Sequence, residues 1–237
     1  MSKYIAVNCG HGVSLDGSWD SGCTYGKYSE AALMLKITKA AVKRLRAAGV
    51  KVLSDADHNN NKNMIVDVRD ANREGVDMYI SIHCDYLKAP SGVMPLYTSA
   101  SGKKLGKALE KSIKKEIGIR SRGVCKRTDL WELNGTDMPA VILETGAIKA
   151  DLKTLRDRPI EYGHAVADGI MDYLGVHPPS ANVKKTDQLY RVRKSWKDTK
   201  SQKGAYKVLT SAKECADKYG YTVYDKGGKA VYHGKKD

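Results

Sequence analysis

Three short segments place a histidine or a glutamate at the end of an apolar run. His11 lies in Asn-Cys-Gly-His-Gly, His83 follows Ile-Ser-Ile, and Glu144 follows Val-Ile-Leu. A buried carboxylate or charged imidazole is costly unless it is paired, so an apolar run is an unfavourable place for one without a use. Two imidazoles and a carboxylate that converge on one edge of a sheet indicate a divalent-metal hydrolase site, with Zn²⁺ as the first expectation.

The elements that would position these residues alternate between strands and helices. We expect strands over residues 3–8, 50–54, 78–83, 93–98, 129–133 and 140–144, and helices over residues 30–48, 64–74, 102–116 and 159–174. This alternation favours an α/β fold with a mostly parallel, twisted sheet flanked by helices. Reactive sites in such folds lie outside the carboxyl ends of the parallel strands, where the two histidines and the glutamate are expected.

A long loop rich in Gly, Ser and Asp, residues 10–28, separates the first strand from the first helix. Loops of this length in compact domains are usually functional. Ser29 is a suitable N-cap for the helix, and Glu30 would then lie in its first turn. A carboxylate there is also favoured by the helix dipole, so a purely structural role for Glu30 stays open.

The chain divides into two predicted domains. Residues 1–175 form the α/β domain, residues 176–187 form a linker rich in proline and small polar residues, and residues 188–237 form a small βαββ domain. In the small domain we expect strands over 189–196, 221–224 and 230–232, and a helix over 208–219. A domain of about 50 residues is near the lower limit for independent folding.

The formal net charge of +14 indicates acidic partners. Residues 180–237 hold 15 Lys and Arg against 6 Asp and Glu, so this last quarter carries most of the excess. Nucleic acid, anionic lipid and an anionic wall polymer are the candidate partners. No apolar run approaches the roughly 20 residues needed to span a bilayer, so we expect no membrane insertion. The five cysteines lack CxxC spacing and are expected to be reduced thiols.

The larger domain resembles a known family through five short motifs in a fixed order. These are Gly-His-Gly at 10–12, Ser-Glu at 29–30, Ser-Ile-His at 81–83, Met-Pro-Ala at 138–140 and Glu-Thr-Gly at 144–146. Their order and spacing are similar to those of the zinc-dependent N-acetylmuramoyl-L-alanine amidases of the type-3 fold, a family of phage endolysins and bacterial autolysins. The likeness covers residues 3–174.

This resemblance implies a role for each matching residue. His11, Glu30 and His83 would be the metal ligands, and Glu144 the catalytic acid/base. A His₂Glu set leaves a fourth position open for water, as a catalytic zinc site requires. The implied reaction is hydrolysis, in bacterial peptidoglycan, of the amide between the lactyl group of muramic acid and L-alanine. The residues that bind the substrate are not identified by these motifs.

The sequence departs from the family pattern beside the proposed ligands. Asp85 stands where the family commonly has Asn after the second histidine, which would add negative charge near the metal. Ala147 replaces an aromatic residue after Glu-Thr-Gly. Cys9 and Cys84 each lie next to a proposed ligand or its glycine.

The tail resembles the SPOR-like repeats attached to wall-lytic amidases. This implies binding to peptidoglycan glycan strands or to an anionic wall polymer, rather than to nucleic acid. The amino terminus enters a strand directly and lacks the pattern of a secretory signal. We therefore expect synthesis in the cytoplasm and action on the wall after release, as a phage endolysin. A sporulation autolysin acting at mother-cell lysis is the alternative.

Two other functions stay open at this point. A Cys–His hydrolase could use Cys84 or Cys9 as the nucleophile, although adjacent residues on a strand point to opposite faces, which weakens a His83–Cys84 pair. A basic nucleic-acid-binding protein would account for the charge, but no recognised nucleic-acid motif is present.

Overall fold

The computed structural model describes residues 3–58, 61–176 and 189–235. The chain forms two compact units, Met1–Pro179 and Ser180–Asp237, and each is described separately below. The predicted linker, residues 176–187, lies almost entirely outside the described residues.

The first unit is built on a six-stranded sheet with the order β4-β1-β5-β8-β6-β7. The strands are β1 (Tyr4–Cys9), β4 (Lys51–Leu53), β5 (Tyr79–Asp85), β6 (Met94–Tyr97), β7 (Cys125–Lys126) and β8 (Ala140–Ala147). The four adjacent strands β4, β1, β5 and β8 run parallel to one another, whereas β6 runs antiparallel to β8. The predicted mostly parallel sheet is confirmed.

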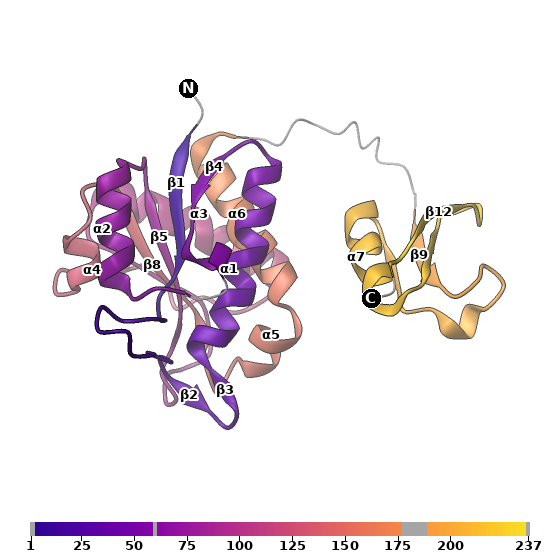
Figure 1. The fold of residues 1–237 in the computed structure, drawn as a ribbon, viewed down its shortest axis with the longest axis horizontal. Helices are drawn as coiled ribbons and strands as arrows, with labels where there is room; N and C mark the ends of the chain where they lie inside the picture. The colour runs from indigo at the N-terminus through magenta and orange to yellow at the C-terminus, as the bar shows by residue number, and fades with distance from the viewer. Residues whose placement is uncertain (1–2, 59–60, 177–188, 236–237) are drawn as a thin grey trace. The chain divides into compact units, whose positions relative to one another are not determined.

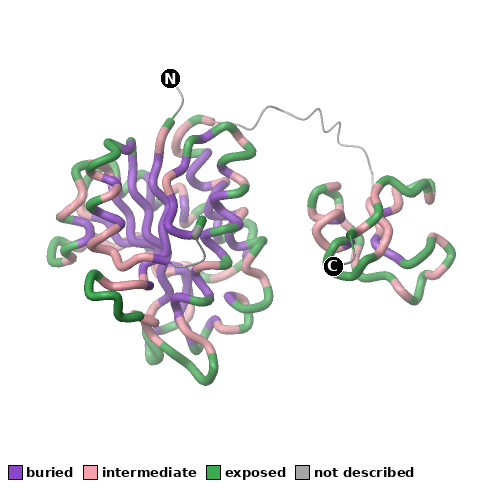
Figure 2. The backbone as a smooth tube through the Cα atoms, viewed as in Figure 1, coloured by how far each residue is buried: buried purple, intermediate pink, exposed green. Residues whose placement is uncertain are grey.

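Helices cover both faces of this sheet (Figure 1). On one face lie α1 (Glu30–Ala47), α3 (Ala100–Ile117) and α6 (Pro159–Leu174), and on the other lie α2 (Met64–Glu74) and α4 (Trp131–Asn134). The strand pleat supplies both cores, because Ile5 and Val7 of β1 join the first core and Ala6 joins the second. Figure 2 shows the resulting buried layer along the central strands.

Local capping explains where the helices begin and end. The Ser29 side chain accepts a hydrogen bond from the Ala32 backbone N–H at 3.3 Å, which makes it the predicted N-cap of α1. Helix α2 ends at Gly75 in the left-handed conformation, with φ of 60°. The bounds of α2 and α6 match the sequence prediction.

The predicted strand over residues 129–133 is wrong, because this segment forms the short helix α4. Its leucines, Leu130 and Leu133, are three residues apart and pack in the core beside α2. The Gly135 N–H closes the turn on the Trp131 carbonyl at 2.7 Å. A run of five residues fits a strand and a helical turn equally well, and tertiary packing decided between them.

Several short elements were not predicted. They are the two-residue strands β2 (Thr24–Tyr25), β3 (Tyr28–Ser29) and β7, the helix α5 (Leu152–Asp157) and the 3₁₀ turns η1 (Asp55–His58) and η2 (Thr199–Ser201). The strands β2 and β3 form a small hairpin within the long loop that precedes α1. Among the helices that the structure describes, none is both long enough and apolar enough to cross a bilayer.

The second unit is a four-stranded antiparallel sheet, in the order β10-β9-β11-β12, with one helix packed against it. Its elements are β9 (Tyr190–Arg193), β10 (Gly204–Tyr206), α7 (Leu209–Tyr219), β11 (Thr222–Tyr224) and β12 (Ala230–His233). The sequence predicts no strand at β10, so the observed order is ββαββ rather than the predicted βαββ. The buried core consists of Val192, Ala212, Ala216 and Val223.

Candidate metal centre

The carboxyl ends of three neighbouring strands bring the predicted residues to one edge of the sheet. His83 on β5 and Glu144 on β8 are register partners on adjacent parallel strands. His11 lies two residues after the end of β1, the other neighbour of β5. Glu30 is the first residue of α1 and reaches the same edge from the helix N-terminus.

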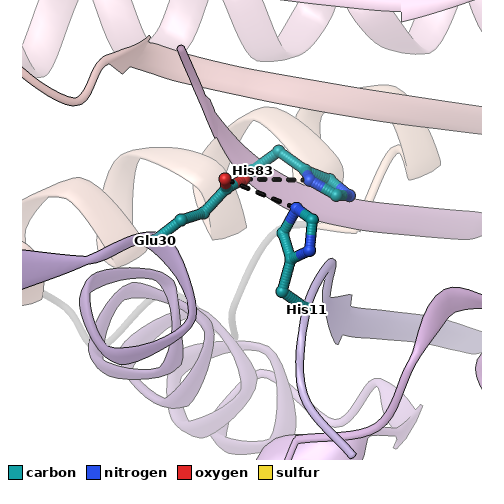
Figure 3. A group of neighbouring side chains, drawn as sticks. All are labelled: His11, Glu30 and His83. Carbon is teal, nitrogen blue, oxygen red and sulfur yellow. Dashed lines mark hydrogen bonds and ion pairs between the residues drawn. The ribbon is translucent and has the colours of Figure 1, made fainter. Parts of the chain in front are cut away.

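The Glu30 carboxylate contacts both histidines from one side (Figure 3). Its Oε1 is 3.0 Å from His83 Nδ1, and its Oε2 is 3.4 Å from His11 Nε2. One ligand atom from each of the three residues lies within 4.8 Å of the other two. The imidazole rings are nearly perpendicular, at 80°, with their centroids 4.9 Å apart.

The backbone holds the Glu30 carboxylate in this position. The Cys84 N–H donates to Oε1 at 3.0 Å, and the Cys23 N–H donates to Oε2 at 3.0 Å. Burial by itself raises the pKa of Glu30, but the hydrogen bonds from His11 and His83 lower it more, to well below its usual range. The carboxyl group is therefore ionised and available as a ligand.

This donor set fits a zinc ion. Two imidazole nitrogens and one carboxylate oxygen are the ligands of many catalytic zinc sites, and they leave one position for water. The histidine nitrogens that face Glu30 are His11 Nε2 and His83 Nδ1, so each ring turns a different atom toward the centre. Cys23, Glu30 and Cys84 form a second group of potential ligands that shares the same carboxylate.

The opposite nitrogen of each ring faces a second carboxylate. His11 Nδ1 is 2.7 Å from Asp20 Oδ2, and His83 Nε2 is 3.7 Å from Glu132 Oε2. Neither acid was identified from the sequence. Asp20 was assigned only to a loop, and Glu132 lay in the segment wrongly predicted as a strand.

Glu144 is partly buried, and its buried Oε2 has no hydrogen-bond partner among the residues that the structure describes. Burial raises the pKa of Glu144 to about 7, with the negative charges of Glu30 and Asp85 adding to the rise. The group lines a pocket of about 250 Å³ together with His83, Glu132 and the exposed ring of Trp131. It is therefore poised to exchange a proton near neutral pH.

Asp85 forms an ion pair beside the centre. Its Oδ2 pairs with Arg122 Nη1 at 2.7 Å, and both side chains are largely shielded from solvent. The negative charge that Asp85 adds near the centre is therefore offset by a nearby guanidinium.

The cysteines are poor candidates for a nucleophile. Cys84 belongs to the core on the α1 face, and Cys9 is fully buried. A hydrogen bond with Cys23 and burial raise the pKa of Cys84, while burial and the nearby Asp55 raise that of Cys9. Because the thiolate is the reactive form, these environments suppress nucleophilic attack.

Two buried polar residues hold the loop that carries His11. Asp55 accepts the backbone N–H groups of Cys9 at 3.0 Å and Lys62 at 2.9 Å. Asn61 donates to the His11 carbonyl at 2.6 Å and to the Ala31 carbonyl at 3.3 Å. Asn61 thus ties the loop to the first turn of α1. Nothing in the local sequence marked either residue, because their partners are distant in the chain.

Comparisons with known proteins identify the family and the fold. The Amidase_3 family, described as N-acetylmuramoyl-L-alanine amidase, matches residues 5–172. The probable cell wall amidase LytH of Staphylococcus epidermidis is 31% identical over 179 residues, which is 72% of this chain and 58% of that protein. The N-acetylmuramoyl-L-alanine amidase LytC of Bacillus subtilis is 25% identical over 183 residues, covering 73% of this chain and 36% of LytC.

Solved structures show the same fold. The amidase AmiC2 of Nostoc punctiforme superposes with a TM-score of 0.66 at 26% identity, covering 73% of this chain and 97% of that one. The catalytic domain of the CD27L endolysin targeting Clostridia difficile has a TM-score of 0.60 at 17% identity, covering 72% of this chain and 97% of that domain. The chain spans 58% or less of the length of the first curated relatives it matches. Since the family match covers most of the chain, the protein belongs to the N-acetylmuramoyl-L-alanine amidase family.

Proposed function

We propose that the protein hydrolyses the amide between N-acetylmuramic acid and L-alanine in bacterial peptidoglycan, with Zn²⁺ held by His11, Glu30 and His83. The observation that carries this proposal is the Glu30 carboxylate in contact with both imidazoles, beside Glu144, whose buried Oε2 has no partner in the described chain. Family membership supports the substrate class.

The proposed reaction needs activation of the carbonyl and transfer of a proton, and Glu144 would carry out the proton transfer. The bound zinc ion would supply Lewis-acid chemistry, drawing electron density from the scissile carbonyl and from a water molecule. Glu144 accepts a proton from that water at Oε2 and passes it to the departing amine of L-alanine. Its raised pKa of about 7 suits both steps, because the same group must accept and then donate a proton.

The pocket offers a surface for the substrate. At the edge of the pocket Trp131 is 49% exposed and is followed in space by Leu130, so this part of the pocket rim is apolar. Arg127 also lines the pocket and holds Asp129 through two hydrogen bonds of 2.8 and 2.6 Å. We assign the aromatic ring to contact with the sugar or the stem peptide, since exposed aromatic rings at a pocket supply large apolar contact area.

The substitution Glu144→Gln tests the catalytic assignment. Gln keeps the shape of the side chain but cannot take a proton, so lysis of purified walls should fall by about 10²–10⁴-fold. Zinc content and wall binding should stay unchanged. Glu161→Gln, at an exposed acid of α6, is the matched control and should keep full activity.

The products identify the bond that is cut. Digestion of purified walls should release new L-alanine amino ends and no new reducing sugars. Reducing sugars without amino ends would instead indicate a glycosidase and contradict the proposed reaction. A fully active Glu144→Gln variant would contradict the role of this residue.

We propose that the second unit binds an anionic or sugar polymer of the wall. Helix α7 covers the sheet face that carries Val192 and Val223, so alternate residues lie on the other face. There Arg191 is the register partner of Tyr224, and the Tyr224 ring lies 5.8 Å from that of Trp196. Cationic and aromatic groups together suit a charged or sugar-rich chain.

Arg191→Ala in the full chain tests this second site. Loss of a cation on the sheet face that α7 does not cover should weaken wall binding. The binding that remains should depend less on salt concentration. Lys218→Ala removes the same charge from α7 and should have little effect. Equal binding by the Arg191 variant, or binding to duplex DNA in place of walls, would contradict the proposal.

Within this activity we propose the role of a phage endolysin, with a sporulation autolysin as the alternative. An endolysin catalytic domain and a bacterial amidase both share this fold, so the fold is compatible with either role. Cells that produce the protein internally should stay intact until their membrane is permeabilised. Lysis without permeabilisation would contradict the proposed release step.

A further inference from the structure

Glu132 is a buried carboxylate in an unusual position. Only 3% of the residue is exposed, and it lies on α4, on the side of His83 away from the metal centre. Its Oε1 accepts a hydrogen bond from the Tyr79 hydroxyl at 2.7 Å, and its Oε2 faces His83 Nε2 at 3.7 Å. A buried acid is costly unless it is paired, so this placement requires a function or a compensating contact.

His83 lacks another partner on that side. Its Nε2 makes no hydrogen bond among the described residues, whereas its Nδ1 faces Glu30 at 3.0 Å. A contraction of about 1 Å would bring Nε2 and Glu132 to the length of a charge-assisted hydrogen bond. Gly10 leaves the ring little other freedom, because a Cβ there would lie 1.9 Å from Nε2.

We propose that Glu132 is a positioning residue for the metal ligand His83. By accepting a hydrogen bond from Nε2–H, it would fix the tautomer whose Nδ1 lone pair is free to bind a metal ion held with Glu30. Histidine ligands of metals commonly donate their other ring N–H to a carboxylate in this way, which fixes the ring and raises its basicity. The inference rests on the proposed zinc site and goes beyond it, because Glu132 acts on the metal only through His83 in this role.

His11 shows the same arrangement with the roles of its two ring nitrogens exchanged. Its Nε2 faces Glu30, and its Nδ1 is bonded to Asp20 at 2.7 Å. Each imidazole therefore lies between the shared carboxylate and one of its own. The Asp20 side chain is 41% exposed and that of Glu132 only 3%, so water can replace Asp20 but not Glu132. We expect the buried acid to contribute more to metal affinity.

The surrounding structure keeps Glu132 in place. Leu133 anchors α4 in the core, and Asn72 of α2 donates to the Gly135 carbonyl at 2.8 Å, just after the helix ends. Such contacts allow a short helix to hold a side chain as firmly as a longer element would.

Zinc affinity of the full-length protein tests the proposal, measured by competition with a chelator. Glu132→Gln should weaken zinc binding by about 10–100-fold. Asp20→Asn should weaken it less. Tyr79→Phe removes the other contact of Glu132 but leaves its charge beside His83. This control should lower the melting temperature of the metal-free protein yet keep the zinc affinity close to that of the wild type.

A measurement on the unsubstituted protein provides a second test. In the cobalt-loaded protein, the ring N–H proton of His83 should give a shifted NMR signal that exchanges slowly with water. The corresponding proton of His11, beside an exposed acid, should exchange faster. Fast exchange at His83, or metal bound through Nε2, would overturn the proposal without reference to any variant.

The outcomes separate this inference from the proposed function. A folded Glu132→Gln protein with unchanged zinc affinity would overturn the positioning role and leave the zinc site standing. If the wild type binds no zinc, the proposed function falls first. A loss of affinity in Tyr79→Phe as large as that in Glu132→Gln would show that the pair acts only through the fold.

Discussion

Glu30, which is buried, and Glu144, which is partly buried, are two carboxyl groups near the same histidine, yet they differ in ionisation. Glu30 accepts hydrogen bonds from the Cys23 and Cys84 backbone and faces both imidazoles, so it stays ionised. Glu144 has an oxygen with no partner in the described chain, and burial raises its pKa to about 7. Environments that separate two such pKa values also separate the roles of ligand and acid/base.

The raised pKa of Glu144 predicts that the folded zinc-free protein loses stability as pH rises. Between the ordinary value of 4.5 and about 7, the unfolded chain has lost this proton and the folded chain keeps it. Stability therefore falls as pH rises through this window, by on the order of 3 kcal/mol. Denaturant titrations should show Glu144→Gln gaining stability relative to the wild type from pH 4.5 to 7. A pH-independent difference would contradict the raised pKa.

At the scale of elements, the sequence predicts what local chemistry decides. The cap at Ser29, the left-handed Gly75 and the apolar runs of β1, β5 and β8 are visible in the chain, and with them the meeting of His11, Glu30, His83 and Glu144. Helix α4 was missed because its turn is fixed by packing against distant residues. The residues Glu132, Asp20, Asp55 and Asn61 were missed for the same reason, because their hydrogen-bond partners lie 7 to 53 residues away in the chain.

The close approach of the chain after β1 to His83 depends on Gly10, which has no side chain. A Cβ on Gly10 would lie 1.8 Å from His83 Cε1, so Gly10→Ala must displace the imidazole. We expect this variant to lose most zinc affinity while its helical circular dichroism stays the same. Gly227→Ala is the control, because a Cβ there meets only Asp225 Oδ1 at 3.5 Å. Zinc binding by Gly10→Ala equal to that of the control would contradict the close packing of β1 on His83.

At the scale of the whole molecule, the two units have separate cores of very different size. The first contains two extensive clusters on either face of the sheet, while the second has four buried apolar residues. Small cores give marginal stability. Only the first unit contains the three residues of the metal centre, so the two units should respond differently to zinc.

Thermal unfolding followed by calorimetry, and denaturant unfolding followed by fluorescence, should therefore each show two transitions. Zinc at about 100 times its dissociation constant should stabilise the first unit by about 2.7 kcal/mol and leave the second unchanged. Calcium at the same concentration serves as a control, because this nitrogen-containing donor set does not suit it. A zinc shift of the second transition would place a binding site in the wrong unit.

The direct test of the zinc centre is X-ray absorption at the zinc edge on the stoichiometrically loaded protein. We predict one zinc ion per chain, with two imidazole nitrogens at about 2.0–2.1 Å, carboxylate oxygen at about 2.0–2.2 Å, and no sulfur. His83→Ala should remove one imidazole contribution. A sulfur shell at about 2.3 Å would instead place the ion on the neighbouring group of Cys23, Glu30 and Cys84, and would contradict the account.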